Sequence, residues 1–194
     1  MYVPDPFCED WPEVLHAAMR DIGFATLVTT GLEANHLPML LQDGVLRGHV
    51  ARANPVWKAG EATALAIFLG PHAYVSPNWY PSKAETGKAV PTWNYITVHA
   101  RGPIRWIQDA DWLRSHVTAL SAHHETPRPD PWKVEDAPAS YIDGLVRAIV
   151  GFELTIESLE GKYKLSQNRS DADQAGVREA FAREGQGDIA RLMK

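Results

Sequence analysis

The sequence has few of the features that define disulfide-bonded, metal-binding or membrane proteins. Cys8 is its only cysteine, which excludes an intramolecular disulfide and a cysteine-rich metal site. No apolar run approaches the roughly 20 residues of a membrane-spanning helix, and the N-terminal segment has no basic and apolar signal pattern. We therefore expect a cytoplasmic protein without a membrane segment.

Positive charge is also scarce. Lys and Arg number 19 against 24 Asp and Glu, so the formal net charge is -5, and no run rich in Lys or Arg occurs. Proteins that hold a nucleic-acid backbone use a basic surface, and many of those that read DNA carry a helix-turn-helix, which is not recognisable here. The sequence therefore argues against direct DNA binding.

Motifs for common catalytic and metal centres are missing as well. No G-x-G-x-x-G follows a predicted strand, which leaves a Rossmann domain without support, and there is no G-x-S-x-G elbow. The cluster His116, His123, His124 and Glu125 lacks the i, i+4 spacing that places two imidazoles on one helical face. We expect no metal site, and the catalytic residues, if any, stay unknown.

Short β-branched and aromatic segments dominate what is present. Asp43-Gly44 separates two apolar runs and predicts a type I′ hairpin, on whose second strand Arg47 and His49 share the face that points away from the core. The residues 62–70 form an almost continuous apolar run, which predicts a strand buried on both faces. Further strands are expected at 24–30, 91–107 and 151–161.

Helix signals lie between and after these strands. Capping residues or turn signals predict helices after Asp10, Asn54, Asp109 and Ser170, whereas 84–89 has the composition of a polar loop. About six strands in hairpin order favour a mainly β protein, an antiparallel barrel with peripheral helices, over alternating βαβ units. We expect a single domain over 1–194, with its core at about 24–168 and a C-terminal helical extension at 170–194.

Three polar clusters could carry chemistry, and each also has a structural interpretation. The first contains His49, Arg52 and Asn54, where a strand ends before a helix N-terminus, a place that suits a phosphate. In the alternative interpretation, Asn54 only caps the helix and Arg52 only forms an ion pair at the surface. The third cluster, Lys162 and Lys164 with nearby polar groups, offers cations to a phosphate, or protects an exposed edge strand.

The second cluster is aromatic. Trp79-Tyr80 and Trp93 with Tyr95 lie among prolines and among hydroxyl and amide side chains. Such a set can clasp a flat ring and hydrogen-bond its edge. An aromatic seam, for instance at a dimer interface, has the same composition, and the two interpretations are compatible.

Five segments, taken in order, resemble the signature blocks of the PaiB-like family of FMN-binding negative transcriptional regulators. They extend over most of the chain from about Phe24 to Asn168 and read LPMLL, LRGHVARANPVWK, AIFLGPHAYVSPNWYPSK, VPTWNYITVHARG and GKYKLSQN. The resemblance implies a split β-barrel of the pyridoxamine-phosphate-oxidase-like type, FMN as cofactor, and a homodimer with flavin sites in grooves between the subunits.

The resemblance also implies which residues line that groove. They are His49, Arg52, Asn54, Ser76, Trp79, Tyr80, Lys83, Thr92, Trp93, Asn94, Lys164, Gln167 and Asn168. Among them we expect Arg52, Lys83 and Lys164 near the flavin phosphate and Trp79 and Trp93 near the isoalloxazine ring.

Different functions are compatible with such a site. The first is a flavin-dependent or redox-linked negative transcriptional regulator that acts without an evident DNA-binding motif. The alternative is a flavin-dependent oxidoreductase, of the NAD(P)H:flavin reductase or oxidase type, in which FMN at the dimer interface carries the hydride. A cofactor-free interaction protein, with the aromatic blocks as its dimer seam, is a further possibility.

Overall fold

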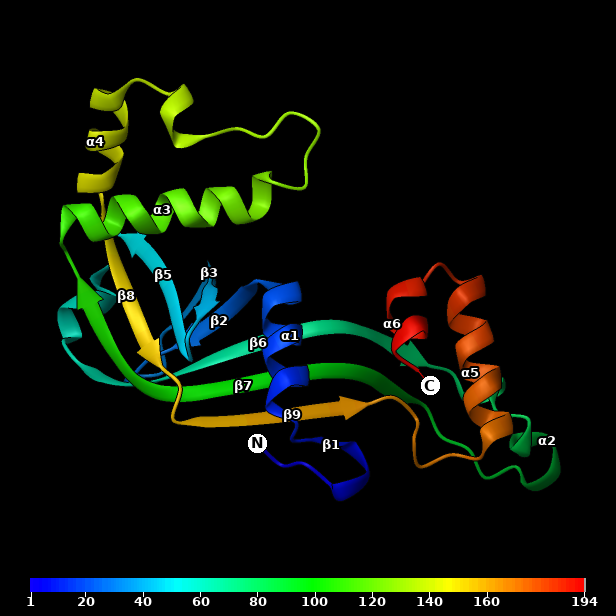
Figure 1. Ribbon diagram of the computed structural model, residues 1–194. Coiled ribbons are helices and arrows are strands. Elements are labelled where there is room, and N and C mark those ends of the chain that lie inside the picture. The colour runs from blue at the N-terminus through cyan, green and yellow to red at the C-terminus, as the bar shows by residue number, and fades with distance from the viewer. Residues whose placement is uncertain (194) are drawn as a thin grey trace. The chain divides into compact units, whose positions relative to one another are not determined.

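The computed structural model describes residues 1–193, and Figure 1 shows the order of its elements. Within these residues the strands form one hydrogen-bonded sheet in the order β3-β2-β6-β7-β8-β5-β4, and β9 pairs with β7 and β1. The packing divides the chain into two compact units. Unit 1 comprises Met1–Ala18, Phe68–His99 and residues 159–193, and unit 2 comprises Met19–Ile67 and Ala100–Ser158.

Unit 2 contains an antiparallel barrel. The strand β2 pairs with β3 and β6, and β8 pairs with β7 and β5, which also pairs with β4. Because β3, the first strand of this order, also packs against β5, the next to last, the sheet curves back on itself into a nearly closed barrel. The predicted mainly β architecture is therefore confirmed. The strands are β2 (Phe24–Val28), β3 (Ala34–Pro38), β4 (Leu40–Gln42), β5 (Val45–Ala51), β8 (Ile149–Thr155), the first part of β6 (Ala62–Val75) and the last part of β7 (Thr92–Ile107).

The β4–β5 hairpin forms for the reason that its sequence predicts. Asp43 has a φ of 49° and Gly44 a φ of 76°, the left-handed values that a type I′ turn requires. Gly48, on β5, lies against the ring of Phe152, and a Cβ at this position would come 2.5 Å from that ring. Glycine is therefore what allows the fully buried Phe152 to fill the barrel beside β5.

Helices cover part of the barrel of unit 2. Asp109 caps α3 (Ala110–Glu125) by accepting a hydrogen bond from the backbone of Trp112 at 2.8 Å. The helices α3 and α4 (Ala139–Arg147) both pack against β8, and Figure 1 shows α3 lying across the ends of β8 and β5. Shorter turns of 3-10 helix are η2 (Pro55–Ala59) and η4 (Val134–Asp136).

Unit 1 is built around the other parts of β6 and β7. A hydrophobic core of Val75, Ile96, Val177, Phe181 and further apolar residues lies between these strands and the C-terminal helices. The elements of unit 1 are η1 (Asp5–Phe7), β1 (Cys8–Glu9), most of α1 (Pro12–Ile22), η3 (Pro77–Trp79), α2 (Ser82–Thr86), β9 (Ser158–Lys164), α5 (Asp171–Arg183) and α6 (Gly187–Leu192). No helix within residues 1–193 has the length and apolar character needed to cross a membrane.

Some local predictions are wrong. The 62–70 strand is not buried on both faces, because Ala64 and Ala66 are buried whereas Thr63 and Leu69 are exposed, and the strand continues to Val75. The expected 151–161 strand is two strands, β8 and β9. A Cβ on Gly102 would lie 1.8 Å from the carbonyl oxygen of Thr155, so the backbones approach very closely where β8 ends.

Two further segments differ from the predictions. The C-terminal extension contains α5 and α6 instead of one helix, and Gly185 between them has a φ of 77°, outside the range of a right-handed helix. The expected loop at 84–89 begins inside the short helix α2. The single-domain expectation stays a prediction, since β6 and β7 each contribute residues to both units.

Candidate functional site

A half-exposed tryptophan forms an open cluster of rings in unit 1. Trp93 on β7 is 52% exposed, and its ring centroid lies 6.1 Å from that of Tyr74 and 6.3 Å from that of His72, both on β6. The Nδ1–H of His72 donates to the carbonyl of Gly70 at 3.0 Å, which fixes the imidazole. We call His72, Tyr74 and Trp93 the Trp93 platform. A ring surface of this kind suits a planar ligand.

A cation is hydrogen-bonded to the backbone of the platform. The ammonium of Lys164, on β9, donates to the hydroxyl of Thr92 at 2.6 Å and to the carbonyl of Trp93 at 2.5 Å. Burial lowers the pKa of Lys164, and the nearby charges of Lys162 and Arg169 lower it further. An anionic ligand at this ammonium would offset both effects, so the group is suited to an anion.

The other predicted residues of unit 1 make contacts within the fold. Asn94 is fully buried, and its side-chain amide donates to the hydroxyl of Ser166 at 3.0 Å and accepts from it at 3.1 Å. Trp79 lies edge-on to Phe181 with ring centroids 5.5 Å apart. Gln167 accepts a hydrogen bond from the backbone of Leu165 at 2.7 Å, which stabilises the turn after β9.

The predicted site residues around η3 also make contacts within the fold. Ser76 caps η3 by accepting from the backbone of Asn78, and Lys83 donates to the side-chain oxygen of Asn78. Tyr80 is buried beneath the guanidinium of Arg169, 4.6 Å from its ring centroid. Its hydroxyl has no hydrogen-bond partner within the described residues. Asn168 is exposed in the turn before α5.

The predicted residues of unit 2 hold the end of β5 and the start of η2. Arg52 donates to the carbonyls of Arg147 at 2.7 Å and Ile149 at 3.0 Å, and also to the side chain of Gln108. Asn54 caps η2 by accepting from the backbone of Val56, as its sequence context predicts, and it donates to Asn35 at 2.6 Å. Whether these groups also reach a ligand stays a prediction.

His49 differs from its expected position. It shares a face of β5 with Arg47, but α3 covers that face, and Nδ1 of His49 lies 3.1 Å from Nε2 of the buried His116. The ring of His116 in turn stacks on Trp112. The spacing of His116 in the sequence gives no sign of this pairing, which joins residues 67 positions apart.

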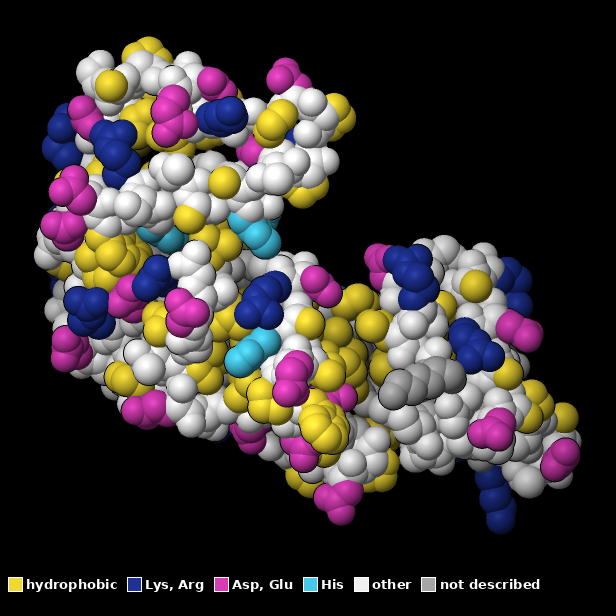
Figure 2. Space-filling model, in the orientation of Figure 1, with side chains coloured by type: hydrophobic (Ala, Val, Ile, Leu, Met, Phe, Trp, Pro, Cys, Tyr) yellow, Lys and Arg dark blue, Asp and Glu magenta, His cyan; other side chains and the backbone are white. Residues whose placement is uncertain are grey.

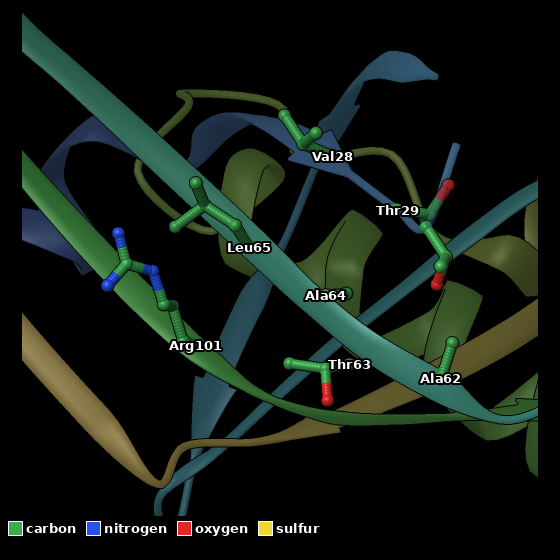
Figure 3. Close-up of a pocket in the computed structure, with 8 residues that line it drawn as sticks. Val28, Thr29, Ala62, Thr63, Ala64, Leu65 and Arg101 are labelled. Atoms are coloured by element: carbon green, nitrogen blue, oxygen red, sulfur yellow. The ribbon is translucent and has the colours of Figure 1, made fainter. Parts of the chain in front are cut away.

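A pocket in unit 2 is lined by residues that the sequence analysis did not single out. It has a volume of about 490 Å³, within the roughly 300–1,000 Å³ of typical small-molecule sites. Figure 3 shows how the lining residues follow the strands, with Arg101 on β7 and Thr63 and Leu65 on β6. Hydroxyl groups beside an arginine suit an oxyanion, but Thr29 and Thr30 after the end of β2 and a single threonine, Thr63, on β6 carry no distinctive sequence signal.

Comparison with known proteins identifies the family. The family model described as "Putative FMN-binding domain" matches residues 1–158. The chain belongs to this FMN-binding family. It is 33% identical to the protease synthase and sporulation protein PAI 2 of Bacillus subtilis over 95% of this chain and 90% of that protein. The resemblance to the PaiB-like FMN-binding family is thereby confirmed, and FMN is its cofactor.

Other members and structures agree with this assignment. An uncharacterized protein of Emericella nidulans is 34% identical to this FMN-binding chain, over 93% of the chain and 90% of that protein. Among solved structures, the FAD and heme binding protein from Mycobacterium smegmatis superimposes with a TM-score of 0.64 at 18% identity, covering 87% of this chain and 78% of that one. That likeness supports the split-barrel fold.

The residues of unit 1 fit the chemistry of a flavin mononucleotide. A flavin offers a flat ring with oxygen and nitrogen atoms along its edge, and a phosphate at the end of a polyhydroxyl chain. The Trp93 platform provides open ring surface, and Lys164 and Thr92 provide a desolvated cation and a hydroxyl beside it. In contrast, no group of three or more His, Cys, Asp or Glu within residues 1–193 is arranged to hold a metal ion.

Proposed function

We propose that the protein is a homodimeric FMN-binding regulator that uses the Trp93 platform to hold the flavin ring. The observation that carries the proposal is the combination of half-exposed Trp93 with the half-buried ammonium of Lys164 beside it. Bound FMN supplies hydride and electron transfer. The chain orients the ring against Trp93, and Lys164 and Thr92 donate hydrogen bonds to its polar atoms or phosphate.

The regulatory part of the proposal rests on a relative and on the surface charge. The Bacillus subtilis relative is named for protease synthase and sporulation. On the face shown in Figure 2, the Lys and Arg side chains of the described residues are interspersed with Asp and Glu. A mixed, net acidic surface does not favour a DNA backbone. Regulation therefore proceeds through the redox state of the flavin or through another protein.

The dimeric part of the proposal rests on exposed apolar side chains of unit 1. Tyr74 on β6 is 46% exposed and lies edge-on to the half-exposed Trp93 on β7, with ring centroids 6.1 Å apart, and Leu69 on β6 is 52% exposed as well. Clustered exposed apolar groups commonly mark an interaction site. A second copy of the chain that covers part of this surface would bury them and enclose the flavin.

Turnover separates a regulator from an oxidoreductase. The rate of NADH and NADPH oxidation by the FMN-loaded protein in air is compared with the rate for free FMN alone. The regulator is expected to give no rate above free FMN, while chemical reduction of its flavin changes the sedimentation coefficient or tryptophan fluorescence. A saturable rate with either nucleotide would instead establish the oxidoreductase.

Duplex binding tests the indirect mode of regulation. Fluorescence anisotropy of a labelled mixed-sequence duplex at low salt, where electrostatic binding is strongest, is expected to show no saturable change with oxidised or reduced protein. Binding that weakens steeply as salt increases would mean that the protein contacts DNA directly.

A further inference from the structure

A buried serine after β9 has a backbone conformation that serine rarely adopts. Ser166 is 4% exposed and has a φ of 69°, in the left-handed region that glycine enters without strain. A residue of this kind persists only where the surrounding contacts hold it. Since glycine would fit this backbone better, the serine hydroxyl is the group whose contacts can explain the residue.

That hydroxyl makes two hydrogen bonds to one fully buried side chain. It accepts from the amide nitrogen of Asn94 at 3.0 Å and donates to the amide oxygen at 3.1 Å. Asn94 directly follows Trp93 on β7, and Ser166 lies two residues after Lys164, the last residue of β9. The pair therefore joins the segment that carries the platform tryptophan to the segment that carries its cation.

A second set of hydrogen bonds encloses the backbone of Lys164. The side-chain oxygen of Gln167 accepts from the backbone N–H of Leu165 at 2.7 Å, and its amide nitrogen donates to the carbonyl of Tyr163 at 2.5 Å. One side chain thus ties down the residues on both sides of Lys164. The side chain of Leu165 is also anchored in the hydrophobic core of unit 1. The backbone at Lys164 therefore has little freedom to move.

The position of the Lys164 ammonium depends on this fixed backbone. The ammonium donates to the hydroxyl of Thr92 and to the carbonyl of Trp93, two acceptors on the first residues of β7. Burial disfavours a cation here, and the positive charges of Lys162 and Arg169 repel it, so the pKa of Lys164 is lowered. If the end of β9 moved away from β7, the flexible lysine side chain would turn toward water, which solvates the charge better.

We propose that Ser166, held by Asn94, is a positioning residue of the FMN site, which keeps the ammonium of Lys164 beside Trp93. The inference rests on the proposed function, in which Lys164 donates to the flavin. Asn94 and Gln167, which the family resemblance implies at the flavin groove, act in the same way. They fix the backbone that carries Lys164 and do not need to touch FMN.

The first test measures Lys164 itself, in the full chain without FMN. NMR titration of protein with lysine isotope-labelled at Cε gives the pKa, and Lys164→Met identifies the resonance. Ser166→Ala removes the hydroxyl, so the ammonium is expected to become more hydrated and its pKa to rise toward the ordinary value. Ser170→Ala is the matched control, because it removes the hydroxyl that caps α5 by accepting from the backbone of Asp173. It is expected to lower stability and to leave the pKa of Lys164 unchanged.

The second test determines whether the effect on FMN acts through Lys164. In fluorescence titrations, Ser166→Ala is expected to weaken FMN binding by about fivefold or more in the native background, and by less than about twofold in Lys164→Met. The second loss is small because the side chain that Ser166 positions is gone. A residue that only stabilises the fold would give similar losses in both backgrounds.

Ser166→Gly separates the hydroxyl from the backbone strain. Glycine adopts the left-handed conformation without strain, so this variant is expected to be more stable to urea than Ser166→Ala. It lacks the hydroxyl all the same, and it is expected to bind FMN as weakly as Ser166→Ala. Gln167→Met serves if neither variant of Ser166 folds, because Gln167 is exposed and its replacement leaves the core intact. It is also expected to raise the pKa of Lys164.

Several results would overturn the proposal. They are an unchanged pKa of Lys164 in folded Ser166→Ala or Gln167→Met, an equal rise in Ser170→Ala, and an equal loss of FMN affinity with and without Lys164. If the native protein does not bind FMN, or if Lys164→Met binds it as tightly as the native protein, the proposed function fails instead. The pKa titration, made without the flavin, still decides whether Ser166 positions Lys164.

Discussion

Each of the two units contains a tryptophan beside a histidine, and the two pairs differ in their exposure. In unit 1, Trp93 lies 6.3 Å from His72, at an interplanar angle of 35°, with half of its surface open. In unit 2, Trp112 stacks on His116 with ring centroids 5.2 Å apart and an interplanar angle of 17°, both rings belong to α3, and Trp112 packs against Gly151 of β8. Similar rings therefore occupy an open surface in one unit and a packed interior in the other.

This difference assigns the two clusters different roles. The rings of the packed cluster already gain their dispersion and burial energy within the fold, so they contribute to stability. The open cluster keeps ring surface that can be buried only when a ligand or a partner chain arrives, so its contribution is to binding. Changes at equivalent positions should therefore affect stability in unit 2 and ligand affinity in unit 1.

The largest expected effect is the loss of stability on truncating the packed tryptophan. Trp112→Ala should lower the free energy of unfolding by about 3 kcal/mol, because it leaves a cavity beside His116 and Gly151 and breaks the hydrogen bond to Glu153. Trp93→Ala should change it by no more than about 0.5 kcal/mol, as is usual for surface positions. Urea denaturation of both variants measures this, and equal losses would contradict the comparison.

The next effect concerns FMN affinity at the open cluster. Lys164→Met should weaken FMN binding by about tenfold or more, since a hydrogen bond to a charged group contributes about 1.5–3 kcal/mol and 1.4 kcal/mol is a factor of ten. Lys162→Met is the matched control on the same strand, because Lys162 donates to the carbonyl of Tyr2 instead. Fluorescence titration with FMN gives both affinities. An equal effect in the two variants would indicate general electrostatic attraction.

The smallest effect is a pH dependence of stability that originates at the packed cluster. The pKa of His116 is about 4 in the folded protein and near 6.5 in the unfolded chain, so the unfolded chain takes up the proton first as the pH falls. This contribution is constant above about pH 6.5 and is lost between about pH 6.5 and 4. Between pH 7 and 5.5 the loss is about 1 kcal/mol, at 1.4 kcal/mol per pKa unit.

Urea denaturation at several pH values isolates this contribution. His116→Phe should lack the corresponding part of the pH dependence, while His72→Phe, the matched change at the open cluster, should keep it. The lowered pKa of His49 acts in the same direction, so a remaining slope of smaller size in His116→Phe is compatible with the account. An unchanged slope in His116→Phe would contradict it.

Structure that depends on neighbouring residues could be predicted from the sequence. The hairpin at Asp43-Gly44 and the caps at Asn54, Asp109 and Ser170 form because each requires a particular side chain or φ angle within a few residues. The strand expected at 91–107 likewise corresponds to β7, on which Ile96 and other apolar residues are buried.

Structure that depends on contacts between distant residues could not be predicted from the sequence. His49 was expected to face away from the core, yet α3, from a segment more than 60 residues later, covers it. Nothing local to His116 indicates this contact. For the candidate flavin site, the sequence supplied the types of residue, but only the pairing of β9 with β7 brings Lys164 to the carbonyl of Trp93.

The most direct test of the central claim is a comparison of FMN affinity among the native protein, Trp93→Ala and Trp11→Ala. Trp11 is also exposed and also belongs to unit 1, but it does not contact the platform rings within the described structure. The account predicts saturable binding to the native protein and to Trp11→Ala, and a loss of at least tenfold in Trp93→Ala. Undiminished binding to folded Trp93→Ala would contradict the placement of the flavin on the platform.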